Sequence, residues 1–325
     1  QVTASRITEI VPWERIIVVT NELYKNEVYK QLPKIPKENV IAEPQKRDTA
    51  LAMLVGALFA KSKDPNAVII NLASDHVVPN QQEFITVMKF AAKTAKENEY
   101  LVAVGISPKR PSTGFGYIKI GQDLEKSHVR LPLFRVNSFT EKPNEATARG
   151  FISTGKYYWN ANMYVWSATV LEQAFKKYVP KTYALTQELS SLEVKSFHNS
   201  LEGIYDKAES ISIDYAVSEK ADNLVLIPGD FGWDDVGDWE VVYNLEKRDS
   251  NGNVILQKDT SKNIIAIDSR NNLIHANGRL VSLVGVNDMV VIDTDEILMI
   301  IPKSRSQEVK KIVNRLKKEN KQEYL

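Results

Sequence analysis

Apolar runs of strand length alternate with helical periodicity through the first hundred residues. Short runs rich in Val, Ile and Leu predict buried strands, which fall at residues 15–20, 40–42, 68–72 and 101–106. The stretches between them repeat their apolar positions at helical spacing and predict helices at residues 21–31, 49–63 and 81–98. This alternation is typical of parallel strands joined by crossover helices. We therefore expect an α/β fold with a Rossmann-like mixed sheet.

The pattern changes after about residue 113. Shorter strands are predicted at residues 117–120, 136–139 and 163–166, followed by a helix over 168–178. Beyond a polar connector, five β-rich runs separated by Asn, Asp or Gly turns predict a small β domain, either helix-like or sandwiched. A terminal amphipathic helix follows. Its apolar face could pack within the chain or form the seam of a homodimer. The expected domains are residues 1–245 and 254–325.

Charge and composition exclude several classes of partner and of functional site. Lys and Arg number 42 against 41 Asp and Glu, a formal net charge of +1, so no basic field favours nucleic acid. The chain has no cysteine, which excludes disulfide frameworks, thiolate zinc sites and a cysteine nucleophile. No apolar run approaches the roughly 18 residues of a membrane helix. The expectation is a soluble, cytoplasmic protein without a nucleic-acid or membrane partner.

Two aspartates stand where a divalent cation could be held. Asp75 follows the strand predicted over residues 68–72, and open parallel sheets bind ligands beyond the carboxyl ends of their strands. Magnesium is bound by one or two carboxylates together with substrate phosphates. One of the two adjacent acids Asp234 and Asp235 could complete such a site with Asp75. A turn or helix-cap role for Asp75, and a polar turn leading into a helix at Asp238, are the structural alternatives.

Glu141 and Lys142 place an acceptor beside an ammonium group just after a predicted strand. Such a pair could bind a sugar hydroxyl and a phosphate, although Glu-Lys pairs are common on surfaces. Gly114 and Gly116 would let a ligand approach backbone amides. These glycines enter a strand rather than a helix, so a dinucleotide-binding fingerprint is not supported.

Asn160 and Asp214 add amide and carboxylate groups suited to hydrogen bonding with a polyol. A further group at the start of the helix predicted over residues 49–63 could contact a base edge. An N-terminal capping box is the structural alternative for that group. Its members are Glu43, Pro44, Arg47 and Thr49.

Taken in order, these segments resemble the sugar-1-phosphate nucleotidylyltransferases, and in particular the mannose-1-phosphate guanylyltransferases that make GDP-mannose. Each segment alone is common, but their combination in the family's order is specific. The resemblance covers residue 1 to at least residue 293. It is carried by residues 43–50, 74–76, 114–118, 139–143, 159–163, 212–220 and 233–237.

The resemblance implies transfer of GMP from GTP to mannose 1-phosphate, giving GDP-mannose and pyrophosphate. Asp75 and Asp235 would hold Mg²⁺ and, with Lys142, would be the catalytic residues. The nucleotide would be bound by Glu43, Pro44, Arg47 and Thr49. The sugar would be bound by Gly116, Glu141, Asn160 and Asp214.

The chain also departs from the family. The family usually has Asn-Thr-Ala-Pro where this chain has Asp48-Thr49-Ala50-Leu51, and Pro-Ala-Asp-His where it has Ala73-Ser74-Asp75-His76, which are mild changes. The segment at Gln1 resembles the family's helix that follows the glycine-rich phosphate loop. We therefore expect this sequence to lack a central strand and the loop that binds the triphosphate, and to be less active or inactive without them. Two other functions stay open: a catalytically inactive nucleotide-sugar-binding or regulatory relative, and a metal-dependent glycosyltransferase.

Overall fold

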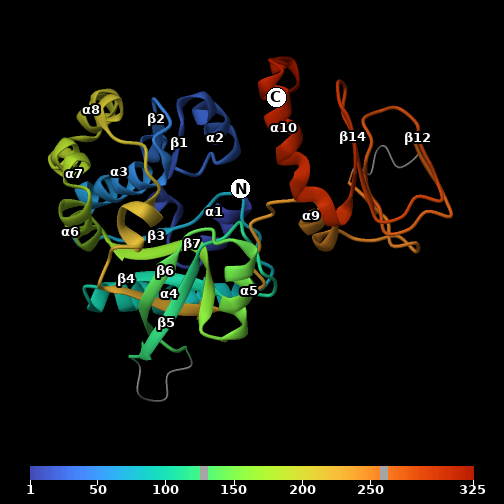
Figure 1. Ribbon diagram of the computed structural model, residues 1–325. Helices are drawn as coiled ribbons and strands as arrows, with labels where there is room; N and C mark the ends of the chain where they lie inside the picture. The colour runs from blue at the N-terminus through green and yellow to red at the C-terminus, as the bar shows by residue number, and fades with distance from the viewer. Residues whose placement is uncertain (125–130, 257–262) are drawn as a thin grey trace. The chain divides into compact units, whose positions relative to one another are not determined.

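The computed structural model describes residues 1–124, 131–256 and 263–325. The chain divides into two compact units, Gln1–Trp233 and Asp234–Leu325. The division expected at residue 245 differs from this boundary, because Trp239 and Tyr243 of helix α9 (Trp239–Leu245) pack into the core of the second unit. In Figure 1 the first unit runs from blue through green and yellow into light orange, and the second runs from orange to red.

The N-terminal unit contains a parallel strand pair, β1–β2, and a mixed six-stranded sheet of order β3-β7-β4-β8-β6-β5. Strand β7 runs antiparallel between β3 and β4, so these two strands are parallel to each other without being neighbours. The expected α/β sheet is therefore confirmed, with β7 inserted into the repeat. The strands are β1 (Val18–Asn21), β2 (Val40–Glu43), β3 (Val68–Asn71), β4 (Leu101–Ile106), β5 (Tyr117–Asp123), β6 (Phe134–Thr140), β7 (Tyr157–Ser167) and β8 (Leu224–Gly229).

The first strand, predicted as buried at residues 15–20, starts later in the structure and is less buried than expected. Trp13–Arg15 form a 3-10 turn after Pro12, so β1 begins only at Val18. Its residues are half-buried because, within the described ranges, β1 has a strand neighbour on one side alone, β2. Strand β3 is half-buried for the same reason, since it pairs with β7 and forms the edge of its sheet.

Helices cover both faces of the six-stranded sheet (Figure 1). Strand β4 alternates between the two faces: Val102 and Val104 meet the apolar side of α4, whereas Leu101 and Ala103 join the core beneath α3, α6 and α8. The unit thus has two hydrophobic layers. Its helices are α1 (Val2–Ile7), α2 (Lys25–Gln31), α3 (Asp48–Lys63), α4 (Gln81–Glu97), α5 (Glu145–Ser153), α6 (Ala168–Tyr178), α7 (Pro180–Thr186) and α8 (Val194–Lys207).

The C-terminal unit is built from stacked parallel strands, which favours the helix-like alternative for this domain. Strands β9 (Val254–Ile255), β11 (Leu273–His275) and β13 (Met289–Asp293) stack in parallel, with β14 (Leu298–Pro302) antiparallel at the edge. Strands β10 (Ile264–Ile267) and β12 (Val281–Val284) form a second parallel pair. The stack has a polar rung, since Asn272 Nδ2 donates to Asn253 Oδ1 at 3.0 Å and both residues are buried.

The predicted terminal helix is present as α10 (Val309–Lys318). Val309 packs against the core of the C-terminal unit, while Ile312 is exposed. In the parts of the chain that the structure describes, no helix combines the length and the apolar character needed to cross a membrane.

Candidate active site

Glu141 and Lys142 follow directly after β6 and form an ion pair of 2.7 Å. Burial raises the pKa of the Glu141 carboxyl, and the hydrogen bond from Lys142 partly offsets that rise. The same hydrogen bond raises the pKa of the Lys142 ammonium. Lys142 has a positive φ of 46°, a backbone conformation that non-glycine residues rarely adopt. The turn therefore holds a cation over a buried carboxyl at the end of a strand.

Gly116 lies against this carboxyl. A Cβ atom at Gly116 would come within 2.5 Å of Glu141 Oε2 and 3.0 Å of the Phe139 ring. No side chain fits there without displacing Glu141. The carbonyl of Gly116 also accepts a hydrogen bond of 2.8 Å from the Asn160 backbone N–H, which ties the glycine to β7.

A bulge in β7 brings Asn160 next to Tyr164. Along β4 the pairing jumps from Met163 to Asn160 between two successive residues, so two residues of β7 are left over. One of them, Asn162, adopts a φ of 52°, which asparagine tolerates better than most residues. As a result Asn160 Nδ2 lies 3.0 Å from Tyr164 Oη, although the two residues are four positions apart on one strand.

Asp214 joins this pair at the start of a π-helical turn, Asp214–Ser218. Its Oδ1 accepts hydrogen bonds from Asn160 Nδ2 at 2.9 Å and from Tyr164 Oη at 2.6 Å. Its Oδ2 makes no hydrogen bond to any side chain or backbone group of the described ranges. The charge of Asp214 also raises the pKa of Glu141 and of Lys142, so the three groups are close.

The structure thus brings together the five residues that the sequence assigned to the sugar and its phosphate. We call them the Glu141 cluster; its members are Gly116, Glu141, Lys142, Asn160 and Asp214. The cluster offers two carboxylates that accept hydrogen bonds, amide groups that accept or donate them, and one ammonium group. That set suits a ligand carrying hydroxyls and a phosphate.

The predicted nucleotide-binding residues lie between β2 and α3. Glu43, the last residue of β2, accepts a hydrogen bond of 3.1 Å from Tyr205 Oη. Burial raises the pKa of the Glu43 carboxyl, and this hydrogen bond partly offsets the rise. Thr49 Oγ1 accepts a hydrogen bond of 2.9 Å from the backbone N–H of Ile213, the residue before Asp214. The start of α3 is therefore joined to the Glu141 cluster.

Arg47 makes a structural contact that the sequence did not predict. Its Nε donates to the Tyr205 carbonyl at 2.5 Å, and its Nη2 reaches the Asp206 carbonyl at 3.3 Å. These carbonyls belong to the last turns of α8, where an arginine satisfies otherwise unpaired acceptors. Arg47 thus fixes the β2–α3 loop to α8, while Pro44 lies on the same loop.

Asp75 is exposed on the loop after β3, as a ligand-binding carboxylate there would need to be. Two side chains of α1 hold the carbonyls on either side of it: Thr3 Oγ1 donates to Ser74 at 3.0 Å and Arg6 Nη2 to His76 at 3.5 Å. His76 in turn accepts a 3.0 Å hydrogen bond from the Trp233 indole. The loop is therefore anchored on both flanks of Asp75.

Asp235 belongs to the C-terminal unit. The backbone N–H of Gly237 donates to its Oδ1 at 3.1 Å, and Val236 between them has a φ of 51°, a strained conformation for a β-branched residue. Asp238 caps α9, as the structural alternative proposed. The described residues contain no group of three metal-ligating side chains. Because Asp75 lies in the other unit, its pairing with Asp235 around a metal stays a prediction.

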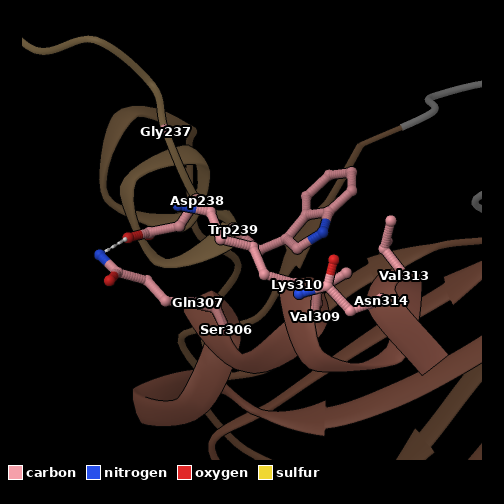
Figure 2. A pocket seen from close by; sticks show the side chains of 9 residues that line it. All are labelled: Gly237, Asp238, Trp239, Ser306, Gln307, Val309, Lys310, Val313 and Asn314. Atoms are coloured by element: carbon pink, nitrogen blue, oxygen red, sulfur yellow. Dashed lines mark hydrogen bonds between the residues drawn. The ribbon is translucent and has the colours of Figure 1, made fainter. Parts of the chain in front are cut away.

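The C-terminal unit carries a groove of its own, about 370 Å³ in volume (Figure 2). Trp239 and Lys310 contribute to its walls, and Gln307 donates to Asp238 at 3.0 Å across one end. No residue assigned to catalysis, nucleotide or sugar lines this groove. Its lining therefore shares no residue with the site built around Glu141.

Sequence reasoning missed Tyr164, Ser218 and Tyr205, all buried and all bonded to a predicted residue or its partner. Tyr164 lies in an apolar run, and nothing in the sequence next to Tyr205 or Ser218 indicates that either side chain supports a binding residue. The structure does mark the site segments in another way, through backbone conformations with positive φ. In the described part of the N-terminal unit, the non-glycine residues with positive φ are Asp48, Lys142 and Asn162, and each lies in one of the resembling segments.

The sequence matches two families in succession. Residues 1–252 match the family described as Nucleotidyl transferase, and residues 262–316 match the MannoseP isomerase/GMP-like beta-helix domain. The second match agrees with the stacked parallel strands of the C-terminal unit.

Individual relatives point the same way. A mannose-1-phosphate guanylyltransferase of Salmonella montevideo is 35% identical over 100% of this chain and 68% of its own length. One from Escherichia coli is 36% identical over 92% of this chain and 64% of its own length, so the chain spans about two thirds of these relatives. A Thermus thermophilus structure described as a mannose-1-phosphate geranyltransferase matches with a TM-score of 0.83 and 28% identity, covering 97% of this chain and 88% of that one. The chain therefore belongs to the nucleotidyl transferase family, and within it to the mannose-1-phosphate guanylyltransferases.

Proposed function

We propose that this protein transfers GMP from GTP to mannose 1-phosphate, giving GDP-mannose and pyrophosphate. The observation that carries the proposal is the Glu141 cluster, a set of groups suited to hydroxyls and a phosphate, in a chain whose whole length matches about two thirds of a named guanylyltransferase. In the proposed reaction a phosphate oxygen of mannose 1-phosphate attacks the α-phosphorus of GTP. The bond from that phosphorus to the β-phosphate oxygen breaks, and no covalent enzyme intermediate forms.

For the sugar we propose the Glu141 cluster. Asp214 Oδ2 and the Glu141 carboxyl would accept hydrogen bonds from mannose hydroxyls, and the Gly116 amide would donate one. Lys142 would meet the sugar phosphate, since its side chain is the exposed partner of the ion pair. An ammonium group there offsets the repulsion between two anionic substrates and so favours the attack geometry.

For the nucleotide we propose the β2–α3 loop. Glu43 would accept hydrogen bonds from the guanine edge, and its anchoring by Tyr205 supports a fixed orientation for that contact. Pro44 and Thr49 would contact the nucleotide beside it. Arg47 would act mainly by holding the loop, because its guanidinium already donates to α8.

For magnesium we propose Asp75 and Asp235 as ligands. Both supply the hard oxygen donors that Mg²⁺ prefers, and one or two carboxylates suffice when phosphates complete the coordination. The exposure of Asp75 on an anchored loop supports its part of the proposal. The ion would supply charge neutralisation at the phosphates.

The test is incubation of the full-length protein with GTP, mannose 1-phosphate and Mg²⁺ while pyrophosphate is measured. Release that depends on both substrates supports the transferase. Binding of both substrates without release would indicate an inactive sugar-nucleotide-binding relative, and GDP release from GDP-mannose a glycosyltransferase. The cytoplasmic location and the homodimer stay predictions, to be checked by fractionation and by light scattering.

A further inference from the structure

The hydroxyl of Tyr164 stands at the centre of a buried polar network behind the Glu141 cluster. Asn160 Nδ2 donates to it at 3.0 Å and Ser218 Oγ lies 3.1 Å from it. A phenol has one proton, and Tyr164 directs it to Asp214 Oδ1 at 2.6 Å. Tyr164 is only 1% exposed, so bulk water does not compete for these contacts.

This network determines how Asp214 presents its carboxylate. Both hydrogen bonds to Asp214 end on Oδ1, which leaves Oδ2 as the acceptor that a ligand can use. The 2.6 Å bond is short, as expected when a hydroxyl donates to an ionised carboxylate, and such bonds are stronger than neutral ones. Without the phenol, Oδ1 would keep one donor and the carboxylate could rotate.

We propose that Tyr164 is a positioning residue that sets the affinity for one hydroxyl of the sugar by fixing the orientation of Asp214. The inference rests on the proposed function, because it takes the ligand at Asp214 to be the mannose of mannose 1-phosphate. Ser218 supports Tyr164 from behind: by donating to the phenol oxygen, it leaves the phenol proton for Asp214.

Packing alone does not account for a tyrosine here. The ring packs beside Trp166, with centroids 4.7 Å apart, in an otherwise apolar core. A phenylalanine would keep these ring contacts. Burying a carboxylate in such a core costs free energy unless its oxygens are hydrogen-bonded, and Oδ2 of Asp214 has no such partner among the described residues, so a ligand hydroxyl is the expected partner.

The test compares Tyr164→Phe with wild type in the full-length protein, by calorimetric titration of mannose 1-phosphate and, separately, of GTP. We expect the dissociation constant for mannose 1-phosphate to rise about tenfold or more, the usual effect of losing a hydrogen bond to a charged group. The constant for GTP should stay within about twofold. Tyr243→Phe is the matched control: it removes a buried phenol bonded to the Gly252 carbonyl in the other unit and should change neither constant.

A panel of mannose 1-phosphates, each lacking one ring hydroxyl, separates positioning from a general structural role. Wild type should lose affinity for the analogue that lacks the hydroxyl bound by Asp214. Tyr164→Phe should no longer discriminate against that analogue. Ser218→Ala should lose part of the discrimination, and Ser218→Thr, which keeps the hydroxyl, should discriminate as wild type does. Uniform weakening for every analogue, or unchanged discrimination in Tyr164→Phe, would overturn the inference. If wild type itself does not bind mannose 1-phosphate, the proposed function fails instead.

Discussion

Lys142 Nζ lies 2.7 Å from Glu141 Oε1 in an ion pair whose two ends differ sharply in exposure: the lysine side chain is 62% exposed and the glutamate side chain 8%. The buried anion is fixed beneath a cation that a ligand can reach. This is the arrangement expected of a phosphate contact whose counter-charge is built into the protein.

Lys142→Gln removes that cation without removing bulk. We expect KM for mannose 1-phosphate to rise by about 100-fold, because a phosphate would then meet the Glu141 and Asp214 carboxylates unscreened. The free energy of unfolding should also fall, by about 1–3 kcal/mol, because the substitution leaves the buried Glu141 carboxyl without its cationic partner. Steady-state kinetics and urea unfolding measure the two effects.

The matched control is Lys177→Gln, which breaks an ion pair with Asp222 on a lysine of similar exposure, 59%. It should leave KM unchanged. Equal KM values for Lys142→Gln and wild type would remove Lys142 from the site.

Gly116→Ala tests the closest approach in the Glu141 cluster. The added methyl would sit 2.5 Å from Glu141 Oε2, so the carboxylate must move. A shift of about 1 Å in a binding group can cost about 100-fold in activity, and we expect a loss of that order in kcat/KM for mannose 1-phosphate. Gly150→Ala in α5 is the control, since an added Cβ there would meet no atom within 4 Å. Similar activity of the two variants would contradict the role of Gly116.

Glu43 makes stability depend on pH. Burial raises its pKa above the ordinary value of 4.5, so the folded state binds the proton more tightly than the unfolded state. The contribution of this carboxyl is fully present below that value and is lost as pH rises through the raised pKa. The glutamine of Glu43→Gln cannot ionise. The free energy of unfolding of this variant minus that of wild type should therefore increase as pH rises from about 4 to about 8. Urea unfolding across this range measures the difference; a constant difference would contradict the prediction.

Asp75→Asn and Asp235→Asn test the proposed metal ligands. Each should lower turnover by about 100-fold or more, because a carboxamide binds Mg²⁺ more weakly than a carboxylate. Chelation of Mg²⁺ should abolish wild-type turnover. Asp75 is exposed, so the fold should survive, as circular dichroism can confirm. Asp222→Asn, on a 78% exposed side chain, is the control, and near-normal turnover in either test variant would remove that residue from the metal site.

The sequence predicted the α/β sheet, the small β domain and the residues of the Glu141 cluster, because apolar periodicity and short motifs are local properties. It failed where long-range contacts decide. The half-buried state of β1 depends on which strands pair beside it, and Arg47 is held by carbonyls of α8 far along the chain. Asn160 meets Tyr164 only because a bulge shortens the path between them, and no sequence period encodes a bulge.

A crystal structure of the full-length protein with mannose 1-phosphate would show directly whether the Glu141 cluster binds the sugar. Electron density for the sugar should lie at the Glu141 cluster, with a hydroxyl on Asp214 Oδ2 and the phosphate on Lys142. Ordered sugar phosphate at a different surface, with the Glu141 cluster bare at saturating ligand, would contradict this assignment of the site.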